Sequence, residues 1–306
     1  VWRYRMVYTP LQDKRLIITP GKGGVGKTTI SCALALYFAS QGDRTLIQSM
    51  DPAHSLRDTL GYVSTNQDNS TEVTEHLLAR EIEPPTVGYS GKKIVDLMAA
   101  FSGLGLLCDT DYAARVLSFV EELYFLDEED YDMGRADRII VDPAPIAGLH
   151  QLLSTAKRLR RIQNVSKNAM KKLLGEETYS TIFDNEYDDD LEYGIDQLDA
   201  FKGKLEDHTL SGFVIPTLPR KTALAKTTRL VRSLREWGYS VDGLVFNEIA
   251  PTTERTRRKA QQRLAEAFAK EVTLPYVLVN KRVNPKLSRD TLQRIGRDVV
   301  KGLSQQ

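Results

Sequence analysis

Cysteine is almost absent from this chain of 306 residues, which contains two, Cys32 and Cys108. They lie too far apart for a C-x-x-C zinc or redox motif, and two cysteines cannot build the disulfide framework of a small secreted protein. Long apolar runs are missing as well, because Gly, Asp or Arg interrupts each oily stretch well short of the ~20 residues that a membrane span requires. We therefore expect a cytoplasmic protein.

A charge excess of one sign is also lacking, since 42 lysines and arginines nearly cancel 41 aspartates and glutamates. No global basic field points to nucleic acid, and we predict no nucleic-acid partner. Charge is concentrated locally instead: Ser154–Gly175 contains seven basic residues and no acid, whereas Glu176–Asp199 contains ten carboxylates and no lysine or arginine. Such runs are usually solvated helix faces with a flexible connector.

Short apolar runs of β type alternate with helical patterns along much of the chain, which is typical of a parallel sheet covered by helices. One helix is expected over about Lys27–Ser40 and another over about Thr222–Trp237, followed by Gly42 and Gly238. The predicted fold class is α/β, with a mostly parallel twisted sheet flanked by helices. The predicted strands are Leu16–Thr19, Thr45–Ser49, Leu77–Ile82, Arg138–Val141, Gly212–Ile215, Leu244–Asn247 and Tyr276–Val279.

Two stretches break this alternation, at about 87–137 and about 151–208, and both have helical patterns. We expect them to be insertions that form a helical subdomain within a single domain spanning residues 1–306. The first insertion contains an apolar run, Ile94–Leu107, and the second opens with the basic run described above.

A glycine-rich loop follows the first predicted strand. Residues 21–28, GKGGVGKT, match the P-loop pattern G-x-x-x-x-G-K-[ST], between a β run and a helical pattern. This order aims backbone N–H groups and the helix dipole at phosphate, so the domain is predicted to be a P-loop NTPase. The predicted nucleotide-binding residues of the loop are Gly21, Lys22, Gly23, Gly24, Val25, Gly26, Lys27, Thr28 and Thr29.

Four residues have chemistry that suits a nucleotide. Lys27 supplies a cation for the β- and γ-phosphates, and Thr28 offers its hydroxyl to Mg²⁺. Asp51 and Asp142 each follow an apolar strand pattern, and ligands of open α/β sheets bind at the carboxyl ends of strands. One such carboxylate can hold a Mg²⁺ water while the other orients the attacking water. Either aspartate could instead be a helix N-cap.

Four phrases together resemble the ArsA-type ATPases: GKGGVGKTT, DPAHSLRDTLG, the strand ending in DPAP, and VIPTLPRKTALAKTTRLVRSLREWGYSVDGLVFNEI. This family has a deviant Walker A loop and includes arsenite-pump ATPases and the Get/TRC ATPase that targets tail-anchored membrane proteins. The resemblance covers nearly the whole chain from about Leu16. It implies an ATP-hydrolysing enzyme that uses ATP and Mg²⁺.

The resemblance assigns a role to Lys22, one residue after the first glycine of the loop. In the deviant Walker A class, this early lysine reaches the nucleotide held by the partner subunit, in the manner of an arginine finger. A solvent-facing loop lysine is the alternative. Because the chain contains one P-loop, two facing sites require two copies. The implied assembly is a homodimer.

Further roles are implied by the same resemblance. Asp51 positions or activates water, and Lys22 and Lys27 join it as catalytic residues. Asp142 acts on Mg²⁺ through water. Asn247 contacts adenine, and Pro275 and Tyr276 belong to a segment that closes over the base.

The chain departs from the family pattern at three places. Its second switch reads DPAPIAGL over Asp142–Leu149 where the family usually has DTAPTGHT, which leaves open whether that loop senses nucleotide. Pro251–Gln262 matches the region where the eukaryotic targeting ATPase has a zinc-binding C-x-x-C, but it contains no cysteine, so no zinc is expected. The arsenite pump uses several cysteines, whereas the relevant insertion here has Cys108, whose apolar surroundings favour a core position.

Two functions remain open. The first is a targeting factor that shields the transmembrane segment of a tail-anchored client and meets a membrane receptor, which would bring it to a membrane through a partner. The second is an ATPase subunit that drives an arsenite or anion efflux pump; DPAHSL disfavours a partitioning ATPase. Ordinary packing is the alternative for each residue of the proposed client groove, which comprises Met98, Phe101, Leu104, Leu107, Ile162 and Met170.

Overall fold

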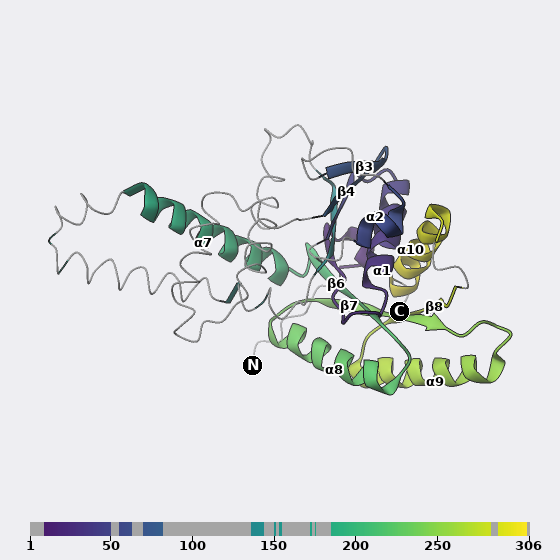
Figure 1. Cartoon of the computed structure of the whole chain (residues 1–306). Coiled ribbons are helices and arrows are strands. Elements are labelled where there is room, and N and C mark those ends of the chain that lie inside the picture. Colours follow the sequence, from purple (N-terminus) through teal and green to yellow (C-terminus); the bar gives the residue numbers. More distant parts are fainter. Residues whose placement is uncertain are drawn as a thin grey trace. The chain divides into compact units, whose positions relative to one another are not determined.

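The computed structural model describes residues 9–49, 55–62, 70–81, 136–143, 150, 153–154, 172, 175, 185–282 and 287–304. The chain divides into two compact units. One comprises Val1–Glu81, Arg135–Pro145 and Lys204–Gln306, and the other comprises Ile82–Gly134 and Ile146–Gly203. The first unit contains the sheet and the P-loop (Figure 1).

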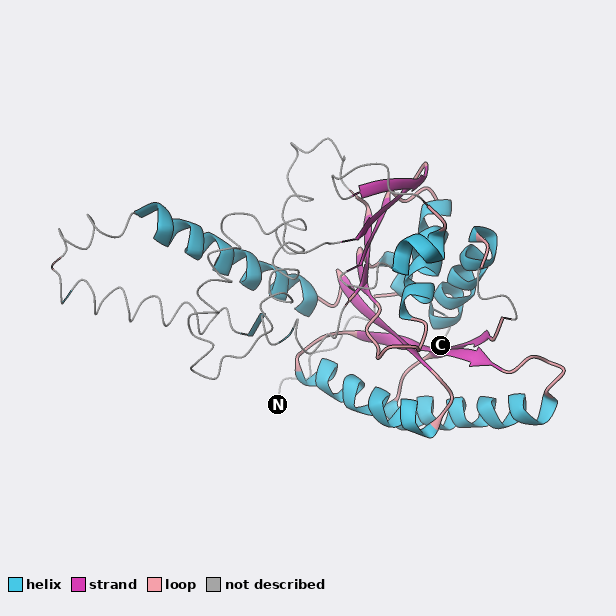
Figure 2. Ribbon diagram, in the orientation of Figure 1, coloured by secondary structure: helices cyan, strands magenta, loops and turns pink. Residues whose placement is uncertain are grey.

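The described strands form one eight-stranded sheet in the order β3-β4-β2-β5-β1-β6-β7-β8 (Figure 2). Within it, β3 and β4 pair antiparallel and the other pairings are parallel. The mostly parallel α/β sheet predicted from the sequence is therefore confirmed. The strands are β1 (Leu16–Ile18), β2 (Thr45–Ser49), β3 (Ser70–Thr74), β4 (Leu77–Glu81), β5 (Arg138–Asp142), β6 (Ser211–Thr217), β7 (Val241–Ile249) and β8 (Tyr276–Asn280).

The sequence patterns found seven of these strands and missed β3. Its sequence, STEVT, has one apolar residue, and Val73 is the one buried side chain in the strand. An edge strand that pairs on one side needs no continuous apolar run, so nothing in its composition distinguishes it from a loop.

Helices cover both faces of the sheet, with α1 and α10 on one face and α8 and α9 on the other (Figures 1 and 2). No helix among the described residues is both long enough and apolar enough to cross a membrane. A short 3-10 turn, η1 (Leu11–Asp13), precedes β1. The helices are α1 (Lys27–Ser40), α2 (Ser55–Leu60), α7 (Asn185–Glu206), α8 (Lys221–Glu236), α9 (Arg255–Val272) and α10 (Arg289–Ser304).

The main core lies between α1, α10 and the sheet, where Ile17, Ile47 and Ile140 of three neighbouring strands are fully buried. α1 is buried over most of its surface, because α10 covers the side that the sheet leaves open. The two helices approach closely at Gly296, where a Cβ atom would lie 2.0 Å from the Ala33 carbonyl oxygen. Any side chain at this position of α10 would push the helix away from α1.

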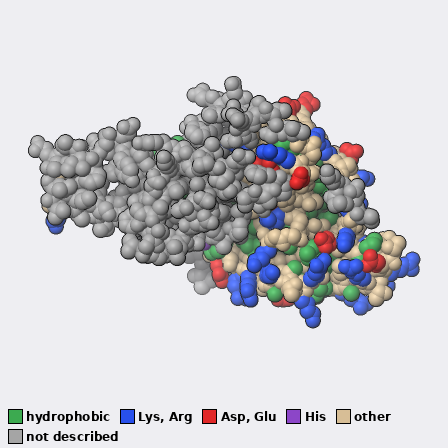
Figure 3. Space-filling model, viewed as in Figure 1, with side chains coloured by type: hydrophobic (Ala, Val, Ile, Leu, Met, Phe, Trp, Pro, Cys, Tyr) green, Lys and Arg blue, Asp and Glu red, His purple; other side chains and the backbone are tan. Residues whose placement is uncertain are grey.

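Basic side chains gather over α8 and α9 (Figure 3). α8 contains five basic residues (Lys or Arg) and one acidic residue, and α9 contains six basic and two acidic residues. The buried face of α8 repeats at helical spacing, with Leu224, Thr227, Val231 and Leu234 against the sheet. Most of the charge therefore lies on the faces that point to solvent.

A buried ion pair fixes the amino edge of the sheet. Lys14, which precedes β1, places its Nζ 2.5 Å from Oδ1 of Asp242 in β7, and their side chains are 1% and 4% exposed. Lys14 also donates to the Ser211 carbonyl and the Ser240 hydroxyl, while Asp242 Oδ2 accepts the Phe213 N–H at 2.9 Å. Burial raises the pKa of Asp242, and the Lys14 ammonium partly offsets that rise. The pair ties the starts of β1, β6 and β7 together.

Removing the charge of Asp242 should destabilise the protein strongly. Asp242→Asn keeps an oxygen for the Phe213 N–H but leaves the Lys14 ammonium buried without a counter-charge, and we expect the free energy of unfolding to fall by about 3–5 kcal/mol. Adding Lys14→Met should recover most of the loss. Urea denaturation followed by circular dichroism measures both changes.

The exposed ion pair Arg257–Glu254 provides a matched control, because its side chains are 55% and 46% exposed. Glu254→Ala should change the free energy of unfolding by less than about 1 kcal/mol. If Asp242→Asn has an equally small effect, the buried pair does not hold the sheet edge.

Candidate functional site

The P-loop connects β1 to α1 through two residues in the left-handed region, Gly24 with φ 77° and Gly26 with φ 91°. Gly26 is the N-cap of α1 and makes no side-chain cap. An α-helix N-terminus carries partial positive charge and N–H groups that have no acceptor within the helix, so it attracts an anion. The loop thus has the geometry expected of a phosphate site.

A hydrogen-bond network fastens the base of this loop. Ser31 Oγ donates to the Lys27 carbonyl at 3.0 Å and makes a short contact with Thr19 Oγ1, which donates to the Val141 carbonyl at 3.2 Å. The network joins α1, β1 and β5. Thr19 and Ser31 were not predicted as site residues, because the P-loop pattern ends before Ser31 and begins after Thr19.

The two residues predicted to hold Mg²⁺ lie together. Thr28 Oγ1 donates to Asp142 Oδ2 at 2.5 Å, and Asp142 is fully buried at the end of β5. Pairing of β5 with β1, Val141 opposite Ile18, places the carboxylate beside the start of α1. One hydroxyl and one carboxylate fit Mg²⁺, which is usually bound by few protein oxygens together with water and phosphate. Among the described residues, no group of three or more His, Cys, Asp and Glu side chains is arranged to hold a metal ion.

Asn247 in β7 reaches the P-loop from the opposite side. Its Nδ2 donates to the Val25 carbonyl at 3.3 Å, and its Oδ1 accepts the Glu248 N–H at 2.9 Å. A Cβ atom on Gly26 would lie 2.2 Å from this Nδ2, so a glycine is required here by contact as well as by its φ angle. The sequence resemblance implied a contact with adenine, but it gave no indication of this contact with the loop.

Pro275 and Tyr276 are not brought to this edge of the sheet. They stand at the start of β8, where the Pro275 carbonyl accepts the Leu244 N–H and Tyr276 packs edge-to-face on Phe246. Since β8 runs parallel to β7, its carboxyl end at Asn280 is the end nearer to the P-loop edge. There Arg258 of α9 donates to Asn280 Oδ1 at 2.6 Å and to the Ala250 carbonyl at 2.8 Å.

The two lysines of the loop differ in environment. Lys22 is exposed, and Lys27 is partly buried as the first residue of α1. Asp51 lies outside the described residues, as do all six residues of the predicted client groove and Cys108. Cys32 is buried in α1, and burial raises the pKa of its thiol, so it is neither a ready nucleophile nor a thiolate ligand.

The short helix that follows the Asp51 segment is held at both ends. Glu81, buried at the end of β4, accepts the Leu56 N–H at 3.0 Å and pairs with Arg57 Nε at 2.8 Å. At the other end of α2, Arg289 donates to the Leu60 carbonyl at 2.9 Å. A negative charge at the start of a helix and a positive charge at its end both interact favourably with the helix dipole. These two anchors were not predicted.

A family model described as anion-transporting ATPase matches residues 14–287, a span that includes the P-loop, Asp142 and Asn247. ATPase GET3C of Arabidopsis thaliana is 28% identical over 83% of this chain and 73% of its own length. The putative arsenical pump-driving ATPase 2 of Aquifex aeolicus is 28% identical over 84% of this chain and 88% of its own length. ATPase ASNA1 homolog 1 of Paramecium tetraurelia is also 28% identical, over 78% of this chain and 76% of its own length.

The contact between Thr28 and Asp142 predicts a metal-dependent effect. Asp142→Asn removes the negative charge next to the expected Mg²⁺ position, so ATP affinity measured with Mg²⁺ should fall at least roughly tenfold. Affinity in EDTA should be almost unchanged, because the phosphates still bind the loop and Lys27. Titration with a fluorescent ATP analogue measures both values.

Ser40→Ala, at the exposed end of the same helix, is the control and should leave both affinities as in wild type. An Asp142→Asn variant that loses equal affinity with and without Mg²⁺ would show that Asp142 supports the loop structurally instead.

Proposed function

This chain belongs to the anion-transporting ATPase family, as its ArsA-type resemblance predicted, and from that premise we propose that it is a dimeric, nucleotide-switched factor that shields transmembrane segments of tail-anchored proteins. Family membership makes it an ATP-hydrolysing enzyme. The observation that carries the nucleotide-dependent part of the proposal is the hydrogen bond from Thr28 of the P-loop to Asp142 at the carboxyl edge of the sheet. That arrangement suits a phosphate and its cation.

The residues predicted for the nucleotide site have different roles in hydrolysis. Lys27 and the loop N–H groups bind the β- and γ-phosphates and offset charge that develops during phosphoryl transfer. Thr28 and Asp142 would hold Mg²⁺, which supplies Lewis-acid polarisation of the phosphate oxygens when bound. Asp51 orients or deprotonates the attacking water. These roles combine the geometry of the described residues with those implied by family resemblance.

The proposed dimer gives Lys22 its role. Lys22 is exposed on the loop, where it can cross to the nucleotide of a partner subunit. A second positive charge on the γ-phosphate would stabilise the transition state only when two subunits face each other. Hydrolysis would then depend on dimer closure.

Mixing two inactive variants tests this role. Lys22→Ala and Lys27→Ala subunits should each hydrolyse ATP roughly 10²-fold more slowly than wild type. A one-to-one mixture should recover up to about a quarter of the wild-type rate, because half of the dimers are hybrids and each hybrid has one intact composite site. Steady-state phosphate release measured against mixing ratio reports the recovery.

Subunit exchange must be verified in the same samples, for example by energy transfer between labelled subunits. If subunits exchange and no mixture is more active than the sum of its parts, Lys22 acts within its own subunit and the facing-site proposal fails.

The client proposal places binding in the second compact unit. Its described helix α7 buries Ile195 and Leu198 while Glu192, Tyr193 and Asp196 are exposed, so the helix has one apolar and one acidic side. The apolar groove residues Met98, Phe101, Leu104, Leu107, Ile162 and Met170 remain a prediction. Their apolar surface would suit a ~20-residue membrane helix. Such a factor would work in the cytoplasm and reach a membrane through a receptor.

A pump-driving ATPase is the alternative, and the name of the Aquifex aeolicus relative, putative arsenical pump-driving ATPase 2, supports it at the same 28% identity as ATPase GET3C and ATPase ASNA1 homolog 1. The thiols of this chain disfavour it. Cys32 is buried with a raised thiol pKa, which leaves each subunit with one available cysteine, Cys108, for a soft metalloid.

Capture of a membrane helix decides between these functions. With ATP bound, the wild-type protein should retain a tail-anchored transmembrane peptide on a pull-down, and Met98→Asp and Phe101→Asp should reduce the retained peptide at least roughly tenfold, because a buried carboxylate would face the apolar peptide. The ATPase rate of each variant, measured without peptide, shows whether the catalytic unit is intact.

Arsenite and antimonite should leave the ATPase rate unchanged, since a lone thiol is a poor site for a soft metalloid. Strong stimulation by either metalloid that disappears in Cys108→Ser, together with no retention of any hydrophobic peptide, would favour the pump.

A further inference from the structure

β7 carries an extra residue where it passes the P-loop. Phe246 pairs with Leu278 and Ile249 with Asn280, so three steps along β7 correspond to two steps along β8. The irregularity is a β-bulge at Asn247 and Glu248. Glu248 has φ 57°, in the left-handed region that a non-glycine residue adopts at a cost. Bulges frequently redirect a side chain near a functional site.

The redirected side chain is that of Asn247. Its Oδ1 accepts from the Glu248 N–H and its Nδ2 donates to the Val25 carbonyl. Because a backbone N–H can only donate and a carbonyl can only accept, the two contacts fix which side of the amide bears the oxygen. The amide therefore has one orientation, with its nitrogen against the turn at Gly26.

We propose that Asn247 is a positioning residue for the P-loop. Through the bulge, its amide holds the Val25 carbonyl and the left-handed turn at Gly26 in the conformation that presents the loop N–H groups to phosphate. A loop held in this way loses less conformational freedom when phosphate binds. This role is separate from the contact with adenine that family resemblance implies. It rests on the proposed binding of nucleotide by this loop.

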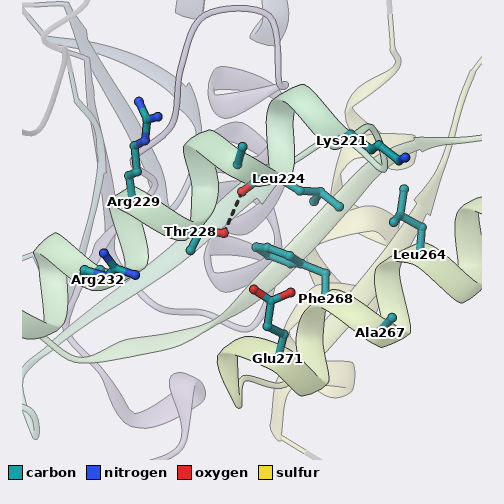
Figure 4. Close-up of a pocket in the computed structure, with 10 residues that line it drawn as sticks. Lys221, Leu224, Thr228, Arg229, Arg232, Leu264, Ala267, Phe268 and Glu271 are labelled. Atoms are coloured by element: carbon teal, nitrogen blue, oxygen red, sulfur yellow. Dashed lines mark hydrogen bonds between the residues drawn. The ribbon is translucent and has the colours of Figure 1, made fainter.

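Glu248 is braced in turn from α8. Arg220 Nη2 lies 3.0 Å from Glu248 Oε2, but the two side chains are 57% and 36% exposed, so this ion pair contributes little by itself. Arg220 is the N-cap of α8. Leu224 of α8 and Phe268 of α9 line a groove of about 530 Å³ between these two helices (Figure 4). The bulge conformation itself remains the main support of Asn247.

Binding of tripolyphosphate tests the proposal, because this ligand has phosphates and no base. Isothermal titration with Mg²⁺ present should show that Asn247→Ala weakens tripolyphosphate by roughly 3- to 10-fold and ATP by at least as much, as expected for loss of one neutral hydrogen bond that preorganises the loop. If Asn247 contacts the base alone, ATP weakens and tripolyphosphate does not. That outcome would overturn the positioning role and leave the proposed nucleotide site standing.

Substitutions of Glu248 test whether the bulge supports the P-loop while leaving Asn247 in place. Gly and Asn adopt the left-handed conformation more readily than other residues do. The variants Glu248→Gly and Glu248→Asn should therefore both bind tripolyphosphate within about twofold of wild type. Glu248→Val disfavours that conformation and should weaken tripolyphosphate as much as Asn247→Ala does. Adding Glu248→Val to Asn247→Ala should cause little further loss, because both act through one contact.

Two results would count against the proposal. Tripolyphosphate affinity unchanged in Glu248→Val would overturn the bulge as the support of the loop, provided that its thermal midpoint matches that of Glu248→Gly within a few degrees. A wild-type chain that binds neither tripolyphosphate nor ATP would overturn the nucleotide site itself, and the positioning role with it.

Discussion

Parallel pairing at the centre of the sheet is the constraint on which the catalytic edge depends. β1 pairs with β5 on one side and with β6 on the other. Parallel strands end at the same edge, so the loop after β1 and the aspartate that ends β5 must meet there. The 2.5 Å contact between Thr28 and Asp142 is the consequence. β7 continues the sheet beyond β6 and brings Asn247 to the same loop from the other side.

The two edges of the sheet use polar groups differently. At the amino edge, Lys14 and Asp242 neutralise each other in a closed, buried pair that ties three strands together. Gly212 leaves room for this pair, since a Cβ atom there would lie 2.4 Å from Asp242 Oδ2. At the carboxyl edge, the helix start at Gly26 and the Thr28–Asp142 contact suit a charged ligand. The first arrangement serves stability, and the second serves chemistry.

Relatives of this chain carry names of more than one kind. Relatives named as arsenical pump-driving and as GET3 or ASNA1 ATPases match the same chain at similar identity. Hydrolysis of ATP needs the phosphate loop, cation ligands and a positioned water. The described residues that meet at the P-loop, Thr28, Asp142 and Asn247, all belong to the first compact unit.

The sequence by itself determined the type of fold, seven strands and the phosphate loop, because apolar runs and glycine spacing act locally. It also placed Thr28 and Asp142 at the carboxyl edge, since both follow predicted strands of a parallel sheet, and the P-loop pattern and the family resemblance assigned both to Mg²⁺. Only the tertiary structure decided that Asn247 holds the Val25 carbonyl and that Glu248 adopts φ 57°. Strand register and bulges depend on neighbours distant in sequence, and no local pattern encodes them.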